Sequence, residues 1–163
     1  MRRSDSEILS VPNSEFFFEV RRLLDQGKNV SINPKGNSMI PFIRSERDVV
    51  VLSSVPQTIE VGDILLFMVG GEYILHRLVG IDGDKLTFMG DGNLCRKEYC
   101  TRKDLVAKVT CIIRNGKKPH VPDKGRIWRF LTPVRRYLIG IYRRVKPSDF
   151  MSFSNSGTIT SKK

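Results

Sequence analysis

The chain has 163 residues, of which 40% are hydrophobic and 28% are charged. This balance is typical of a globular protein with one core, and it excludes a wholly disordered chain or a collagen-like one. The 28 Lys and Arg residues outnumber the 17 Asp and Glu residues, which gives a formal net charge of +11. Such an excess favours an anionic partner, whether nucleic acid, phospholipid or an acidic peptide, but charge alone does not choose among them.

The amino terminus is polar, and no apolar stretch of signal-peptide length follows it, so we expect no export by a cleaved leader. Apolar runs are only a few residues long, whereas a membrane span needs about 20 residues. Cys95, Cys100 and Cys111 are an odd number of cysteines, which favours reduced thiols and a cytoplasmic location. Their spacing does not match a zinc site, so we predict neither a metal nor another cofactor.

The first predicted element is a helix over Glu15–Gln26, with Ser14 as its cap and Gly27 as its stop. From Asn29 onward, runs of β-branched and apolar residues predict a mainly β, mostly antiparallel domain. Strands do not alternate with long helices, which disfavours a doubly wound nucleotide-binding fold. The predicted strands are Val30–Asn33, Asp48–Ser53, Ile64–Val69, Tyr73–Ile81, Lys85–Met89 and Leu105–Arg114, with turns at Gly70-Gly71, Asp82-Gly83 and Asn115-Gly116.

The composition changes after Pro119, because the stretch from Lys124 to Lys146 has eight basic residues and no acidic one. Thr132-Pro133 is a favourable helix start. The predicted helix separates apolar from cationic residues, which is typical of a helix on an anionic membrane surface. Packing of this helix on its own domain and binding of nucleic acid are the alternatives. The apolar residues are Val134, Leu138, Ile141 and Val145, and the cationic ones, seven apart, are Arg129, Arg136 and Arg143.

These features divide the chain into four parts. Residues 1–13 are an N-terminal tail, and residues 14–118 form the β-rich domain. Residues 119–146 form the basic amphipathic segment. Residues 147–163 are rich in Ser and Thr with little to bury, which predicts a disordered tail.

Two residues are candidates for catalysis. Ser38 lies in a polar, glycine-containing turn, where a hydroxyl can be exposed beside backbone N–H groups, as a nucleophile and its oxyanion hole require. A serine in such a turn more often only caps it. His76 shares a strand face with Ile74 and Leu78, and it is either a satisfied core residue or a base for the serine proton.

Four sequence boxes, in their order and spacing, resemble those of the signal peptidase I and LexA-like serine peptidase superfamily. This resemblance covers roughly Val30 to Val109 and implies a β-rich fold in which a serine attacks a peptide carbonyl and a later lysine or histidine takes its proton. It implies that Ser38 is the nucleophile and His76 the base. The boxes are GNSMIP at 36–41, VGDI at 61–64, LHRLV at 75–79 and GDGN at 90–93.

The base in this resemblance is either a lysine or a histidine. No lysine occurs between Lys35 and Lys85, and Lys85 lies past the predicted strand Tyr73–Ile81 that carries His76. The pair His76-Arg77 is similar to the histidine version found in signal peptidases of the endoplasmic-reticulum type. A Ser-His pair is therefore expected.

The remaining site roles also follow from the resemblance. The orienting acid is Asp91 in the Gly-Asp box or Glu98 a few residues later, and Asp91 also suits a plain turn. The oxyanion hole consists of the Ser38 backbone N–H with Asn37 as a possible side-chain donor, unless Asn37 is only an exposed turn residue. Met39 lines either a substrate cleft or the core.

The expected function is that of a serine endopeptidase that cleaves a leader or precursor peptide in trans. A self-cleaving repressor of the LexA type is disfavoured, because the resemblance implies that such a protein has a DNA-binding unit before the peptidase domain and cuts an Ala-Gly or Cys-Gly bond. Only 37 residues precede Ser38, and the chain has neither dipeptide. The alternative is a catalytically idle or self-cleaving module of the same fold that binds nucleic acid or membrane through its basic segment. A preprotein signal peptidase would need a partner or a surface-binding helix, which would place the protein at the inner face of the membrane.

Overall fold

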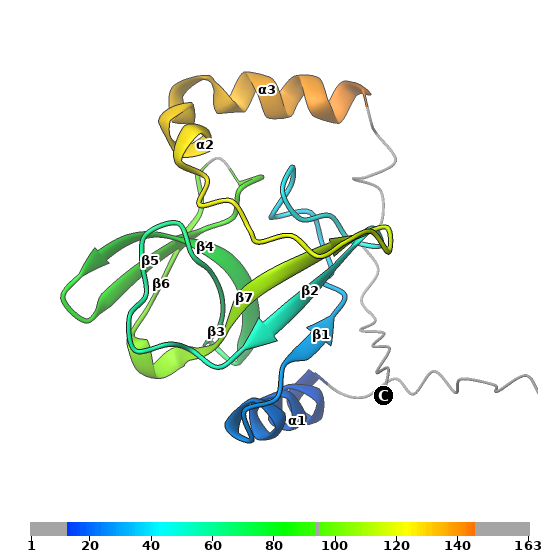
Figure 1. Cartoon of the computed structure of the whole chain (residues 1–163). Helices are drawn as coiled ribbons and strands as arrows, with labels where there is room; N and C mark the ends of the chain where they lie inside the picture. The colour runs from blue at the N-terminus through cyan, green and yellow to red at the C-terminus, as the bar shows by residue number, and fades with distance from the viewer. Residues whose placement is uncertain (1–12, 94, 146–163) are drawn as a thin grey trace, which may run out of the picture.

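The computed structural model describes residues 13–93 and 95–145 (Figure 1). The elements are, in chain order, α1 (Asn13–Asp25), β1 (Val30–Ile32), β2 (Asp48–Ser53), β3 (Ile64–Val69), β4 (Glu72–Asp82), β5 (Lys85–Met89), β6 (Lys97–Cys100), the 3-10 turn η1 (Arg102–Asp104), β7 (Leu105–Arg114), α2 (Arg126–Phe130) and α3 (Thr132–Val145).

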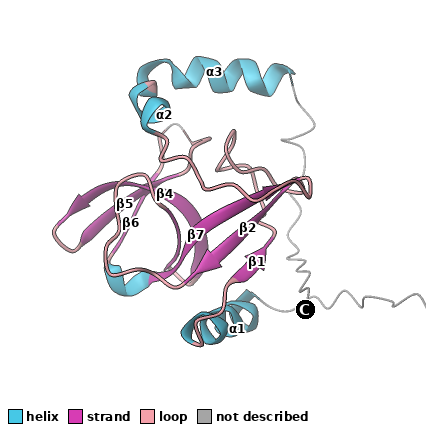
Figure 2. Ribbon diagram, viewed as in Figure 1, coloured by secondary structure: helices cyan, strands magenta, loops and turns pink. Residues whose placement is uncertain are grey.

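The strands form one antiparallel seven-stranded sheet in the order β1-β2-β7-β3-β4-β5-β6, so the predicted mainly β fold is confirmed. The register shifts in three pairs, β2 with β7, β3 with β7 and β4 with β5. Such irregularities bend strands and increase their twist. Figure 2 shows the resulting curved sheet, with α1 at one end and α2 and α3 at the other.

Most predicted elements agree with the structure. β2, β3, β5 and β7 have the predicted bounds, β1 ends one residue earlier, and β4 is one residue longer at each end. The first helix begins two residues before the predicted start and ends one residue before the predicted end, so Ser14 lies inside it and the predicted cap is wrong; α3 begins at Thr132 as expected. β6 and α2 were not predicted, because runs of four and five residues carry too little periodicity to be recognised.

The core consists of two clusters of buried side chains on the two faces of the curved sheet. β3 contributes to both, because side chains alternate along a strand. Ile64 and Leu66 lie in the first cluster, with Leu24 of α1, and Leu65 and Phe67 lie in the second. The second cluster also includes residues of β4, β5 and β6, and β4 is the strand that carries His76.

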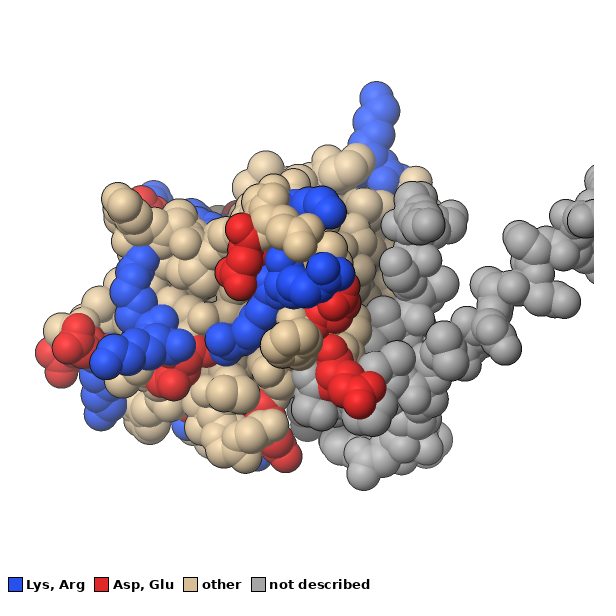
Figure 3. Space-filling model, turned by 90° about the horizontal axis from the view of Figure 1, so that it is seen from below, with Lys and Arg blue, Asp and Glu red and all other residues tan. Residues whose placement is uncertain are grey.

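The predicted tails over 1–13 and 147–163 fall outside the described residues, except for Asn13, the first residue of α1. Within the described part of the chain, no helix has the length and apolar character needed to cross a membrane. On the end of the molecule that carries α1, basic and acidic side chains are interspersed (Figure 3).

Candidate active site

Ser38 lies in the loop between β1 and β2, and its side chain is exposed. The residues that follow it anchor the loop, because Met39 and Ile40 are buried and the N–H of Ile43 donates to the carbonyl of Met39 at 3.0 Å. Met39 packs in the first core cluster, so its side chain supports the loop from beneath rather than facing outward. Asn37 is half-buried, and its carbonyl accepts the N–H of Ile40 at 3.3 Å.

The GDGN box forms a platform for the serine loop. The N–H of Gly92 donates to the carbonyl of Ser38 at 2.8 Å. A Cβ atom at Gly92 would lie 2.8 Å from the carbonyl oxygen of Asn37, and one at Gly90 would lie 2.5 Å from that of Ser38. Only glycine permits such a close approach of two backbones. These glycines therefore join two loops that are more than 50 residues apart in the sequence.

His76 is buried on β4, where it is paired with Leu65 of β3. Its Nε2 atom lies 2.9 Å from the point where Gly90 would carry a Cβ, and the carbonyl oxygen of Ser38 lies 2.5 Å from the same point. The imidazole thus lies over Gly90 with Nε2 beside the serine loop. Within the described part of the chain, the side chains of Ser38 and His76 form no hydrogen bond. In ligand-free enzymes such bonds are often long and tighten when substrate binds.

Glu98 holds the other ring nitrogen of His76. Nδ1 lies 2.9 Å from Oε2 of Glu98, and both side chains are buried. A neutral imidazole that faces a carboxylate in this way donates from Nδ1 and carries its lone pair on Nε2. The register of the sheet explains this contact. Glu98 of β6 pairs with Phe88 of β5, and Phe88 pairs with Leu78 of β4. Leu78 is two residues from His76, so both lie on the same face of β4.

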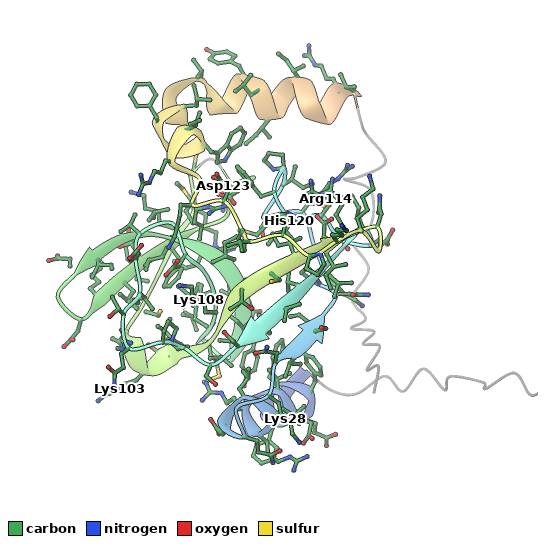
Figure 4. All side chains as sticks on the ribbon, in the orientation of Figure 1. Lys28, Lys103, Lys108, Arg114, His120 and Asp123 are labelled. Carbon is green, nitrogen blue, oxygen red and sulfur yellow. The ribbon has the colours of Figure 1, made fainter. Side chains whose placement is uncertain are left out.

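Asp91 is bound to Arg77 rather than to His76. Nε and Nη2 of Arg77 donate to its carboxylate at 2.8 and 2.7 Å, and both residues are buried. Nη1 of Arg77 donates to the carbonyls of Gly62 and Asp123 at 2.8 and 2.6 Å; Asp123 lies on the segment that leads to α2 (Figure 4). The two candidate acids therefore have separate contacts: Glu98 lies on the imidazole, whereas Asp91 pairs with a buried guanidinium.

The VGDI box has a structural role in which Asp63 binds two lysines. Its carboxylate accepts hydrogen bonds from Lys108 at 2.9 Å, from Lys124 and from the N–H of Glu60 at 2.9 Å. Burial by itself raises the pKa of Asp63, but the bonds from Lys124, Glu60 and Lys108 outweigh it, and the pKa is lowered. The ion pair with Lys124 ties the C-terminal segment to β3.

The second histidine and the three cysteines lie apart from these contacts. His120 is exposed and pairs through its backbone with Ile112 (Figure 4). All three cysteines are free: Cys95 is exposed, Cys111 is half-buried and Cys100 is buried. Burial raises the pKa of the Cys100 thiol to about 11, and the charge of Asp104 acts in the same direction.

The mainly antiparallel β domain is consistent with the LexA and signal-peptidase-like superfamily, which a family comparison supports. Residues 6–110 match the model of the Peptidase S24-like family, and the chain belongs to that family. The match includes Ser38, His76, Asp91 and Glu98 and ends within β7, before α2 and α3. No curated protein matches the chain at a significant level.

Proposed function

We propose that the chain is a serine endopeptidase that cleaves a leader or precursor peptide in trans, with Ser38 as nucleophile and His76 as base. One observation carries this proposal: His76 has Nδ1 fixed on Glu98 and Nε2 beside the Ser38 loop. A nucleophile, a base and a group that orients the base are the parts that acyl transfer by a serine requires.

In the proposed reaction, the Ser38 hydroxyl attacks the peptide carbonyl while Nε2 of His76 takes its proton. The imidazolium then gives that proton to the leaving amine, and the acyl-enzyme is hydrolysed by water activated in the same way. Glu98 fixes the tautomer of the neutral imidazole and stabilises the imidazolium once it forms. We assign the oxyanion hole to the backbone N–H of Ser38 with the Asn37 side chain as a second donor.

The proposed base and acid each follow from a contact. His76 lies over Gly90 beside the serine loop, whereas Lys108 and Lys124 are held on Asp63. This supports the histidine-base variant similar to signal peptidases of the endoplasmic-reticulum type.

Of the two candidate acids, Glu98 is our choice for the orienting residue, because it is the carboxylate on Nδ1. Asp91 instead neutralises Arg77 and so holds the platform on which the serine loop rests.

A peptide library tests this proposal. The unaltered chain is incubated with proteome-derived peptides, and new termini are identified by mass spectrometry. Termini that appear with the unaltered chain and with Ser31→Ala, a variant of an exposed serine on β1, but not with Ser38→Ala or His76→Ala, support cleavage in trans. If the same new peptide termini appear with the unaltered chain and with Ser38→Ala, cleavage by Ser38 is contradicted. Fragmentation of the chain itself at a rate independent of its concentration would instead indicate the self-cleaving alternative.

A further inference from the structure

The apolar stripe of α3 is exposed to solvent. Ile139, on another side of the helix, is only 3% exposed and anchors α3. Packing of the predicted stripe on its own domain is therefore not what the structure shows. The exposed fractions are 45% for Val134, 43% for Leu138, 61% for Ile141 and 70% for Val145.

α2, which comes directly before α3, also carries exposed apolar side chains. Ile127 and Phe130 are 78% and 85% exposed, whereas Trp128 points inward. The indole N–H of Trp128 donates to the carbonyl of Asp91 at 3.0 Å, and its ring meets Phe42 edge-on at 5.8 Å between centroids. α2 is thus fixed to the active-site platform through Trp128, while Ile127 and Phe130 remain exposed. We call Ile127, Phe130, Val134, Leu138, Ile141 and Val145 the helical face.

The surroundings of the helical face are basic. Residues 126–144 include six arginines and no acidic residue. Arg126 and Arg144 are exposed. The side chains of Arg129, Arg136 and Arg143 lie outside the described set, so the separate cationic face remains a prediction. The end of the molecule that carries α1 instead mixes both signs of charge (Figure 3).

We propose that the helical face docks on the surface of an anionic lipid bilayer. Large exposed apolar patches mark interaction sites, and this patch combines bulky aliphatic and aromatic side chains with a run of arginines. A bilayer with anionic headgroups satisfies both, because the acyl boundary takes up the apolar side chains while the headgroups pair with the arginines. Nucleic acid would neutralise the arginines but leave the apolar side chains in water, and a second copy would bring another net charge of +11 against the first.

Docking in this way brings the candidate active site close to the lipid. Figure 1 shows α2 and α3 at the same end of the molecule as the loop that follows β1, which carries Ser38. Trp128 links α2 to Phe42 in that loop and to Asp91 in the platform. The docking proposal does not depend on catalysis, and it is tested without an activity measurement.

The test is sedimentation of the full chain with vesicles of equimolar phosphatidylcholine and phosphatidylglycerol, and with vesicles of phosphatidylcholine alone. We expect at least about tenfold stronger binding to the anionic vesicles. In Leu138→Gln/Ile141→Gln, binding falls at least about tenfold, because two aliphatic side chains that the bilayer would bury are lost. In Phe18→Gln/Ile81→Gln, two comparably exposed apolar residues away from the helical face are changed, so binding stays as in the unaltered chain.

Three results overturn the proposal. The first is equal binding of the unaltered chain to anionic and neutral vesicles, which needs no variant and so does not depend on a variant's folding. The second is equal vesicle binding by the unaltered chain and Leu138→Gln/Ile141→Gln, with both shown to be folded by circular dichroism. The third is tight binding of duplex DNA by both proteins while neither sediments with vesicles, which would assign the basic segment to nucleic acid.

Discussion

A single methyl group at Gly90 tests whether the serine loop and the histidine are held together by this platform. In Gly90→Ala the new Cβ would lie 2.5 Å from the carbonyl oxygen of Ser38 and 2.9 Å from Nε2 of His76. Carbon–oxygen contacts in proteins are rarely closer than about 3.3 Å, so the serine loop has to move by about 0.8 Å. A displacement of that size at a reacting group lowers the rate roughly 10²-fold, and overpacking costs about 1–3 kcal/mol of stability.

The cleavage rate of a peptide identified in the library measures this effect, with thermal unfolding of the same samples as a check on folding. The matched control is Gly80→Ala on β4, whose Cβ would meet only Thr87, at 3.6 Å, an ordinary van der Waals contact. We expect Gly80→Ala to keep the unaltered rate. A folded Gly90→Ala protein with the rate of the unaltered chain would show that the contact between the platform and the serine loop does not position the nucleophile.

Three further predictions concern single side chains. Glu98→Gln removes the carboxylate from the imidazole and lowers the cleavage rate roughly 10²- to 10⁴-fold with little effect on stability. Asp91→Asn instead mainly lowers the free energy of unfolding, measured by urea denaturation. A larger rate loss in Asp91→Asn together with a larger stability loss in Glu98→Gln contradicts this assignment. Because the folded-state pKa of Asp63 is lowered, this residue stabilises the fold above its unfolded pKa near 4, and the stabilisation is lost as the pH falls through the folded pKa. In urea denaturation, Asp63→Asn should therefore lower the free energy of unfolding less in acid than at neutral pH. An equal loss at both pH values argues against these ion pairs. Since burial raises the pKa of Cys100 to about 11, iodoacetamide near pH 8 should modify exposed Cys95 first, and equal modification of both thiols would contradict the burial of Cys100.

The sheet could largely be predicted from the sequence, because most of its strands are apolar runs bounded by glycine turns. Ile64–Val69 and Leu105–Arg114 are such runs, and the structure gives them the predicted bounds. The strand Lys97–Cys100 could not be predicted in this way, since it has only four residues and two of them are charged. Only its pairing with β5 makes it a strand, and pairing between distant segments cannot be seen in local periodicity.

The candidate residues of the site could be named from the sequence, but their contacts could not. The boxes identified Ser38 and His76 as candidates, and the structure places His76 beside the serine loop. The choice between Asp91 and Glu98 stayed open, because it depends on the combined register of β4, β5 and β6. A buried arginine next to a buried histidine was the missing signal: Arg77 requires a carboxylate of its own, and Asp91 is the one it binds.

The most direct test of the Ser-His mechanism is the reaction of the chain with a fluorophosphonate probe, followed by mapping of the adduct by mass spectrometry. If Ser38 is activated by His76, the adduct forms on Ser38 in the unaltered chain and forms on it at most very slowly in a folded His76→Ala protein. Labelling of Ser38 at the same rate in both proteins, or an unlabelled Ser38 in the unaltered chain while another serine reacts, would contradict the mechanism.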